Sequence, residues 1–266
     1  MKASVVITTY DDDLRLGLTL WGWSGQSTKD FELVVVNDGG SSEQATADLV
    51  LSFKKYLPVR YEYLLPKKDP EKPEFRLAAA RNLGLRHASG DLCIISDCDT
   101  IPEYNVVDLM TKKARDNRVL IGIRKRINIT LVPMLNRHIF HKLDELAYSN
   151  DERMEATDLR TPFLALKDTA PPGSWDYCWG CLFAAPLKHF KALGGFDERF
   201  TGWGGEDCDM AERLVRGAGC GLYSMPEAVV YHLDHRPRDS KPYVGDKKLA
   251  EFRASYTHTR NGGPIE

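Results

Sequence analysis

The sequence predicts an α/β domain in which a mostly parallel central sheet is flanked by helices. Short, continuous runs rich in β-branched residues alternate with segments that can be helical, as in sheets whose strands are buried on both faces. The chain has 266 residues, of which 42% are hydrophobic and 28% charged. This length is enough to form a hydrophobic core in one large domain or two small ones. Ligands of such a sheet bind beyond the carboxyl ends of its strands.

The alternation is clearest in the first hundred residues. Residues 3–9 (ASVVITT) predict a buried strand, and residues 14–24 can form a helix. A second buried strand over 31–36 ends at the polar loop NDGGSS, which can cap a helix running to about residue 56. The pattern then repeats with a strand over 61–65, a charged loop over 66–73, a helix over 75–88 and a buried strand over 92–96.

The pattern becomes less regular from Pro102 onward. A long polar and basic stretch runs from residue 124 to about 169, and residues 170–173 (APPG) form a break. The residues from about 236 to the end are rich in charge, Pro and Gly, which indicates a flexible tail or a lid. The other expected elements are helices over 105–116, 186–193 and 207–215 and strands over 119–123 and 228–232.

Charge and hydropathy exclude several partners. Lys and Arg number 36 against 38 Asp and Glu, so no overall basic field draws the chain to nucleic acid or an anionic membrane. The longest apolar stretches, such as 33–36 and 182–186, fall far short of the roughly 20 residues that cross a bilayer. No signal-peptide pattern follows Met1, so we expect a cytoplasmic chain without a membrane span.

Two short patterns have ordinary explanations. The six cysteines are expected to be reduced thiols, although Cys178 and Cys181 form a C-x-x-C spacing that could be half a zinc site or a redox pair. No second pair completes a zinc site, and the spacing lies too late in the chain for a redox motif. The basic run Arg124-Lys125-Arg126 could contact phosphate, but such runs are more often a solvated edge or loop.

Acidic residues stand at two places where chemistry is expected. Asp97 and Asp99 follow a buried strand, and two carboxylates emerging together can hold Mg²⁺ or Mn²⁺. Glu206 and Asp207 begin a helix after a glycine-rich segment, where the helix dipole favours ionised acids and glycines allow close approach of a substrate. Simple helix capping by acids would leave Trp203 and the glycines unexplained.

Two histidines near the last expected strand are further candidates. His232 or His235 could complete the ligand set of a metal held by Asp99, although a single histidine is usually only a satisfied polar residue.

These motifs together resemble nucleotide-sugar glycosyltransferases of the GT-A fold, most closely the large family-two group. The segment 202–207 (GWGGED) also looks like the catalytic segment of animal β-1,4-galactosyltransferases and, less closely, of polypeptide N-acetylgalactosaminyltransferases. The resemblance covers residues 3 to about 235. Its motifs, in family order, are VVITTY (5–10), VVNDG (35–39), RNLG (81–84), GD (90–91), DCD (97–99), GGFDE (194–198) and GGED (204–207).

The resemblance implies a binding site for a UDP-sugar. Thr8, Thr9, Tyr10 and Asp38 match positions that hold the base and ribose of a uridine nucleotide, with Asp38 accepting from the uracil N–H. Arg81 matches an arginine near the nucleotide and diphosphate.

The resemblance also implies a metal, Mn²⁺ or Mg²⁺. Asp97 would face the ribose or the metal, and Asp99 would ligate the metal directly. His232 matches the late metal-ligand histidine, with His235 as the nearby rival.

The catalytic group implied by the resemblance is Asp207, as general base. Glu206 and Trp203 would hold the acceptor or the donor sugar. Retaining N-acetylgalactosaminyltransferases typically carry Asn where this chain has Asp207, so the resemblance favours inversion. The expected reaction moves a hexose or N-acetylhexosamine to an acceptor hydroxyl by single displacement, on a saccharide, peptide or small-molecule acceptor.

The expected organisation is one GT-A domain over 1–235. Its nucleotide-binding half covers 1–100, and its acceptor-binding and catalytic half covers 101–235, followed by the tail or lid over 236–266.

Two other functions are compatible with the fold class. A nucleotidyltransferase that makes a nucleotide sugar usually has a Gly-rich basic loop after its first strand, whereas residues 8–13 read TTYDDD. A non-catalytic sugar-binding or nucleotide-binding module would not need both Asp99 and Asp207, which are present.

Overall fold

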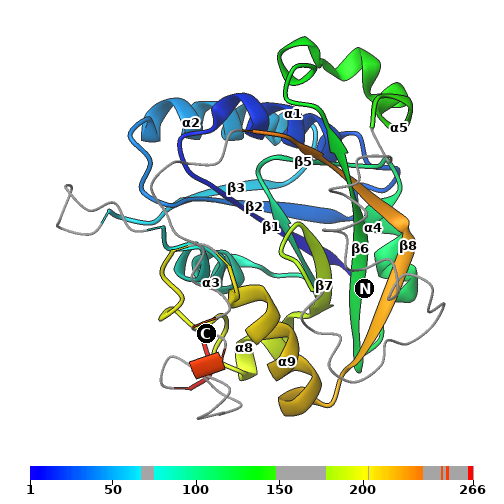
Figure 1. Ribbon diagram of the computed structural model, residues 1–266. Coiled ribbons are helices and arrows are strands. Elements are labelled where there is room, and N and C mark those ends of the chain that lie inside the picture. Colours follow the sequence, from blue (N-terminus) through cyan, green and yellow to red (C-terminus); the bar gives the residue numbers. More distant parts are fainter. Residues whose placement is uncertain are drawn as a thin grey trace.

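The computed structural model describes residues 1–66, 75–147, 178–202, 204–235, 247, 250–251 and 263–265. These residues form an α/β structure with one central sheet and helices on both of its faces (Figure 1). The fold class expected from the sequence is therefore confirmed.

The sheet contains eight strands. They are β1 (Ala3–Thr9), β2 (Phe31–Asn37), β3 (Val59–Tyr63), β4 (Leu92–Asp97), β5 (Thr100–Pro102), β6 (Arg118–Ile127), β7 (Leu182–Pro186) and β8 (Gly221–Leu233).

The helices are of very different lengths. They are α1 (Asp13–Ser24), α2 (Glu43–Leu51), α3 (Leu77–His87), α4 (Val106–Lys113), α5 (Leu143–Leu146), α8 (Leu187–Ala192) and α9 (Glu206–Ala218), with the 3₁₀ turns η1 (Ser52–Lys55), η2 (Val132–Met134) and η3 (Arg137–Lys142).

The strand order determines where the functional residues meet. The order is β3-β2-β1-β4-β7-β6-β8-β5; the β3–β2, β2–β1, β1–β4 and β6–β8 pairs are parallel, and the others are antiparallel. Because β4 and β6 both run antiparallel to β7, they point the same way. The carboxyl ends of β1, β2, β4, β6 and β8 therefore meet at one edge of the sheet.

Each face of the sheet has its own core. One cluster joins the sheet to α1, η1 and α4, and a second joins it to α3, α8 and α9, so that the helices lie in two layers around the strands (Figure 1). Gly84 of α3 packs closely on β1, since a Cβ there would lie 2.3 Å from Cγ1 of Val6. This close approach explains the glycine of the RNLG segment.

Several element boundaries differ from the expectations. Strand β3 begins two residues earlier than expected, and β8 begins at Gly221 rather than near residue 228. Strands β5 and β7 were not expected: β5 has only three residues, and β7 is a short apolar run whose periodicity does not distinguish strand from helix. All five residues of β7 are buried because it fills the space between β4 and β6.

The basic run of residues 124–126, expected in a solvated edge or loop, lies in strand β6 and not in a loop. Strand β6 continues to Ile127 because it pairs with β8 as far as that residue. Two of the three charges have acidic partners: Lys125 pairs with Asp144, and Arg126 Nε lies 2.7 Å from Asp234 Oδ1. Side chains alternate between the faces of a strand, so Arg124 and Arg126 share one face and Lys125 points to the other.

Other expectations lie outside the described residues. They concern the charged loop over 67–74, the stretch 148–177 with its break at 170–173, Trp203 and most of the tail. Within the described ranges, no helix is both long and apolar enough to span a membrane.

Candidate functional site

The residues expected to bind a nucleotide line the ends of β1 and β2. Thr8 and Thr9 are buried at the end of β1, and Asp38 directly follows β2. Both carboxylate oxygens of Asp38 face Arg76: Oδ2 accepts the Arg76 backbone N–H at 2.8 Å, and Oδ1 lies 2.8 Å from its Nη2. Sequence reasoning missed Arg76, which stands just before α3 with no spacing signal.

Arg81 forms a closed charge cluster with two acids. Its side chain is 2% exposed; Nη1 donates to Glu206 Oε1 at 2.7 Å, and Nη2 donates to Asp97 Oδ1 at 3.2 Å. The ring of Phe196 lies 5.2 Å from the guanidinium carbon. We call Arg81, Glu206 and Asp97 the closed cluster, because each acid has its counter-charge within the protein.

Burial governs the ionisation of Glu206. Removal from water, and then the charge of Asp207, raise the pKa of Glu206 to about 7, although Arg81 opposes the rise. The carboxylate that was expected to hold a sugar is therefore buried against Arg81, and its role toward a sugar stays a prediction.

The RNLG and GGFDE segments, far apart in the chain, are joined by hydrogen bonds. Asn82 Nδ2 donates to the Phe196 carbonyl at 2.8 Å and to Glu198 Oε1 at 2.9 Å, and its Oδ1 accepts from the Phe196 N–H at 2.7 Å. These contacts hold the segment before α9 against α3. The two motifs thus fix the position of α3 relative to the segment that leads to α9.

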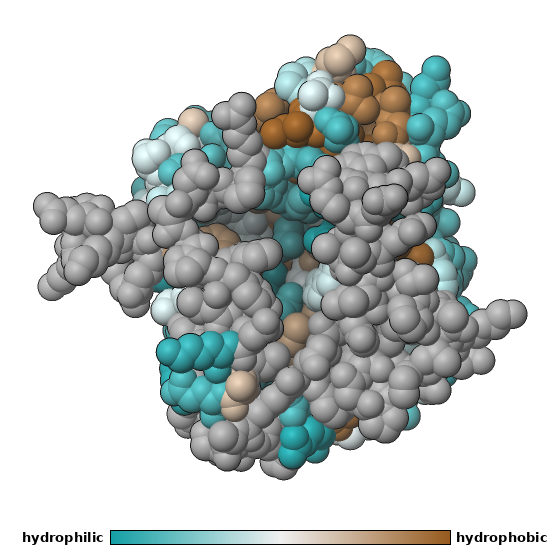
Figure 2. Space-filling model, viewed as in Figure 1, coloured by the Kyte–Doolittle hydropathy of each residue, from teal (hydrophilic) through white to brown (hydrophobic). Residues whose placement is uncertain are grey.

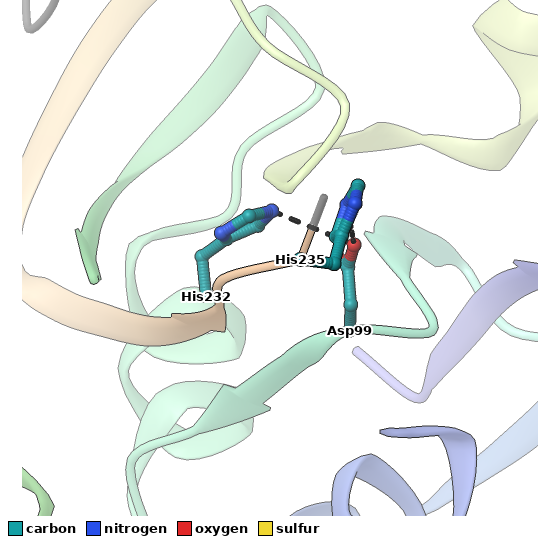
Figure 3. A group of neighbouring side chains, drawn as sticks. All are labelled: Asp99, His232 and His235. Atoms are coloured by element: carbon teal, nitrogen blue, oxygen red, sulfur yellow. Dashed lines mark ion pairs between the residues drawn. The ribbon is translucent and has the colours of Figure 1, made fainter. Parts of the chain in front are cut away.

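A second cluster of ionisable side chains lies at the same edge of the sheet and has no arginine or lysine among its members. Asp99 follows β4, His232 ends β8, and His235 lies just beyond; the three side chains point toward one another (Figure 3). One ligand atom from each lies within 4.8 Å of the others. Asp99 Oδ2 is 3.5 Å from Nε2 of His232 and 3.2 Å from Nε2 of His235. We call these three residues the open cluster.

The open cluster fits a divalent metal ion. Asp99 Oδ1 is buried and has no hydrogen-bond partner, so it can accept a ligand. Two imidazoles and a carboxylate suit Mn²⁺ better than Mg²⁺, which prefers oxygen ligands alone. Both histidines join the group rather than one excluding the other. Asp97, also expected near the metal, points to Arg81 and lies outside it.

The charges in the open cluster act on one another. Burial disfavours the imidazolium of His232, but the charge of Asp99 and the hydrogen bonds with Asp234 and Asp99 outweigh it and raise the pKa to about 9, against the charge of Arg124. The histidines in turn hold the pKa of Asp99 well below its usual value, despite burial. The carboxylates of Asp99 and Asp234 therefore stabilise the protonated form of His232.

Asp234 and Arg126 form a chain of contacts that ends at Nδ1 of His232, the ring nitrogen farther from Asp99. Asp234 Oδ1 lies 3.3 Å from Nδ1 of His232 and accepts from Arg126 Nε at 2.7 Å. A carboxylate on Nδ1 directs Nε2 toward a metal. This support could not be predicted from the sequence, because Arg126 lies in β6 and Asp234 follows β8.

Asp207 is oriented by backbone N–H groups. Its Oδ2 accepts from the Gly180 N–H and its Oδ1 from the Cys208 N–H, both at 2.8 Å. Gly180 has no room for a side chain, since a Cβ would lie 1.9 Å from Nη2 of Arg81. Gly204 and Gly205, with φ of 94° and 89°, turn the chain into α9 in a conformation that favours glycine.

The C-x-x-C spacing now has a different explanation. Cys178 and Cys181 are both buried. Gly180, between them, packs on Arg81, and its N–H donates to Asp207. Sequence reasoning missed this role of the glycine.

Figure 2 shows a hollow near the middle of the face seen in Figure 1, where most of the visible described residues are hydrophilic.

Comparison with known proteins gives two family matches. Residues 4–183 match the model of glycosyl transferase family 2, and residues 160–236 match the N-terminal domain of galactosyltransferase. Chondroitin synthase of Escherichia coli is 31% identical over 245 residues, covering 86% of this chain and 34% of that protein. Validoxylamine A glucosyltransferase of Streptomyces hygroscopicus subsp. limoneus is 32% identical over 227 residues, covering 79% of this chain and 47% of that protein. The chain thus spans less than half the length of these relatives.

Solved structures share the fold at low identity. S. aureus TarS 1–349 in complex with UDP-GlcNAc aligns with a TM-score of 0.63 and 16% identity, covering 94% of this chain and 64% of that chain. The mannosyltransferase PcManGT from Pyrobaculum calidifontis, in complex with GDP-Man and Mn²⁺, aligns with a TM-score of 0.56 and 17% identity, covering 90% of this chain and 58% of that chain.

Proposed function

Because the chain belongs to glycosyl transferase family 2, we propose that it transfers a hexose or N-acetylhexosamine from a UDP-sugar to an acceptor hydroxyl with inversion. The observation that carries the proposal is that the open cluster and the oriented carboxylate of Asp207 lie at one edge of the sheet. Residues 1–100 would hold the nucleotide, residues 101–235 the acceptor and the catalytic groups, and residues 236–266 a tail or lid.

The donor is proposed to be a uridine nucleotide. The resemblance of Asp38 to a uracil-binding position supports it, as does a fold neighbour that binds UDP-GlcNAc. A second neighbour binds GDP-Man, so the base has to be tested directly. The backbone N–H and guanidinium of Arg76 hold Asp38 in place for a base contact.

Asp99, His232 and His235 would hold Mn²⁺. A bound divalent cation offsets the charge that develops on a diphosphate leaving group without a protonation step.

Asp207 would act as the general base. A carboxylate within reach of the acceptor hydroxyl takes its proton while the acceptor oxygen bonds to the anomeric carbon. The bond from that carbon to the diphosphate oxygen breaks, and its electron pair leaves with the nucleoside diphosphate. The N–H groups of Gly180 and Cys208 restrict rotation of the carboxylate, so little reorientation is needed.

The first experiment is calorimetric titration of UDP and GDP into the protein with Mn²⁺ and then with EDTA. We expect UDP binding that depends on the metal. Absence of binding by either nucleotide would contradict the proposal, and tighter GDP binding would contradict the proposed base. Metal-dependent binding without transfer from any UDP-sugar would favour the non-catalytic module. Synthesis of a nucleotide sugar from a sugar phosphate and UTP would indicate a nucleotidyltransferase.

Replacement of the base tests the catalytic role. Asp207→Asn should lower turnover by about 10²- to 10⁴-fold because the amide cannot accept the proton, while UDP binding is unchanged. Cys208→Ser, at the neighbouring position, is the control that keeps both acids and should retain activity. Turnover of Asp207→Asn close to that of the control would exclude Asp207 as the base.

A further inference from the structure

Arg76, Arg81, Arg124 and Arg126 lie near the edge of the sheet where the candidate site is, and three of them are ion-paired. Arg76 pairs with Asp38, Arg81 with Glu206 and Asp97, and Arg126 with Asp234. The fourth, Arg124, makes no side-chain hydrogen bond or ion pair within the described part of the chain. Its guanidinium carbon instead lies 4.7 Å from the ring centre of Trp179.

The position of Arg124 connects the open cluster with Asp207. Arg124 lies on the same face of β6 as Arg126, whose partner Asp234 contacts His232. In the register of the parallel β6–β8 pair, Arg124 lies opposite Val230, two residues before His232. Trp179 immediately precedes Gly180, whose N–H binds Asp207. A half-buried guanidinium thus stands beside the proposed metal ligands with a flat ring holding one side of it.

A guanidinium that has no acidic partner among the described residues is suited to bind a phosphate. Arginine presents several N–H donors in a planar fork that matches phosphate oxygens, and stacking on an aromatic ring orders it without using those donors. Arg81, the arginine expected near the diphosphate, has both ends of its guanidinium bound to buried or partly buried acids. Its charge is therefore already offset within the protein.

We propose that Arg124 binds the diphosphate of the donor and remains bound to it as it leaves. The inference rests on the proposed function. A leaving nucleoside diphosphate carries about three negative charges, of which a divalent cation offsets two, so one further cation is needed. Trp179 positions the guanidinium, and Arg81 supports the closed cluster instead of the phosphates.

The test compares UDP with UMP in calorimetric titrations containing Mn²⁺. Arg124→Met should bind UDP about 10- to 100-fold more weakly than the wild type, because a charge-assisted contact is lost. The loss should be smaller for UMP, which lacks the terminal phosphate. Arg124→Lys, which keeps the charge, should bind UDP with intermediate affinity. Mn²⁺ alone should bind Arg124→Met at least as tightly as the wild type, because the variant removes a neighbouring positive charge.

Arg118→Met is the matched control. Arg118 lies on the same strand and stacks on Tyr223 at 4.3 Å, but at the opposite end of β6. It should bind UDP like the wild type. Equal UDP affinity of Arg124→Met and wild type would overturn the proposal, as would equal losses for UDP and UMP or a matching loss of Mn²⁺ binding.

Two further outcomes separate the sources of failure. If Arg124→Met binds UDP normally but has a raised KM for an anionic acceptor, the arginine binds the acceptor and the proposal is wrong. If the wild type itself does not bind UDP with Mn²⁺, the proposed function fails first, and this inference fails with it.

Discussion

The closed and open clusters lie at the same edge of the sheet but differ in how their charges are satisfied. In the closed cluster, Arg81 is almost fully buried and hydrogen-bonded to both of its acids. In the open cluster, Asp99 keeps one buried carboxylate oxygen without a hydrogen-bond partner among the described residues. The comparison teaches that a cluster of charged residues can take a cation only where a buried carboxylate oxygen is left without a partner.

Residue identity alone does not separate the two clusters. Asp97 and Asp99 are two residues apart in one motif, yet Asp97 points to Arg81 and Asp99 to the histidines. Alternation along the chain is interrupted at the end of β4, where residues 98 and 99 turn into β5. The turn therefore decides which acid of the motif faces Arg81 and which faces the histidines.

Removal of Arg81 should have the largest effect on stability. Arg81→Met would leave two acids without their buried counter-charge, so we expect the free energy of unfolding to fall by about 3–5 kcal/mol. Urea unfolding followed by circular dichroism measures the change. Arg216→Met is the control, because the Arg216–Glu212 pair is 47% exposed at the arginine and should contribute about 0–1 kcal/mol. Similar losses for both variants would mean that the closed cluster is not a special source of stability.

The second largest effect should be a pH dependence of the unfolding free energy that arises from Glu206 of the closed cluster. Burial raises the pKa of Glu206 from 4.5 to about 7, so its stabilising contribution is complete below pH 4.5 and is lost as pH rises through 7. The amide of Glu206→Gln does not titrate. The unfolding free energy of the wild type minus that of the variant should therefore decrease by about 3 kcal/mol between pH 4.5 and 8. Urea titrations across that range measure it. A difference that is constant with pH would show that Glu206 stays ionised in the folded protein.

The sequence predicts most strands of the sheet and the acidic motifs, but not strand β7 or the contacts between distant segments. The buried strands β1, β2 and β4 have continuous β-branched runs, which leave little ambiguity. Strand β7 could not be predicted because its place between β4 and β6 depends on residues far away in the chain.

The partners of the site residues were equally hidden. Arg76, Gly180 and Asp234 each contact a predicted residue through folding of distant segments. The basic run at 124–126 predicts a solvated edge or loop because three adjacent charges are usually solvated. The strand alternation that gives each of them a different partner is visible only in the fold.

The smallest of these effects should appear in the support of the open cluster. Asp234→Asn would remove the carboxylate charge that His232 Nδ1 and Arg126 share, and with it the preference for presenting Nε2 to a metal. We expect Mn²⁺ affinity to fall about 10- to 100-fold, which is the usual effect of losing a group that orients a metal ligand. Titration of Mn²⁺ followed by electron paramagnetic resonance measures it without any nucleotide. Asp144→Asn is the control, because Asp144 pairs with Lys125, which points to the opposite face of β6. If the two variants bind Mn²⁺ equally, Asp234 does not orient His232, and the open cluster depends on its three members alone.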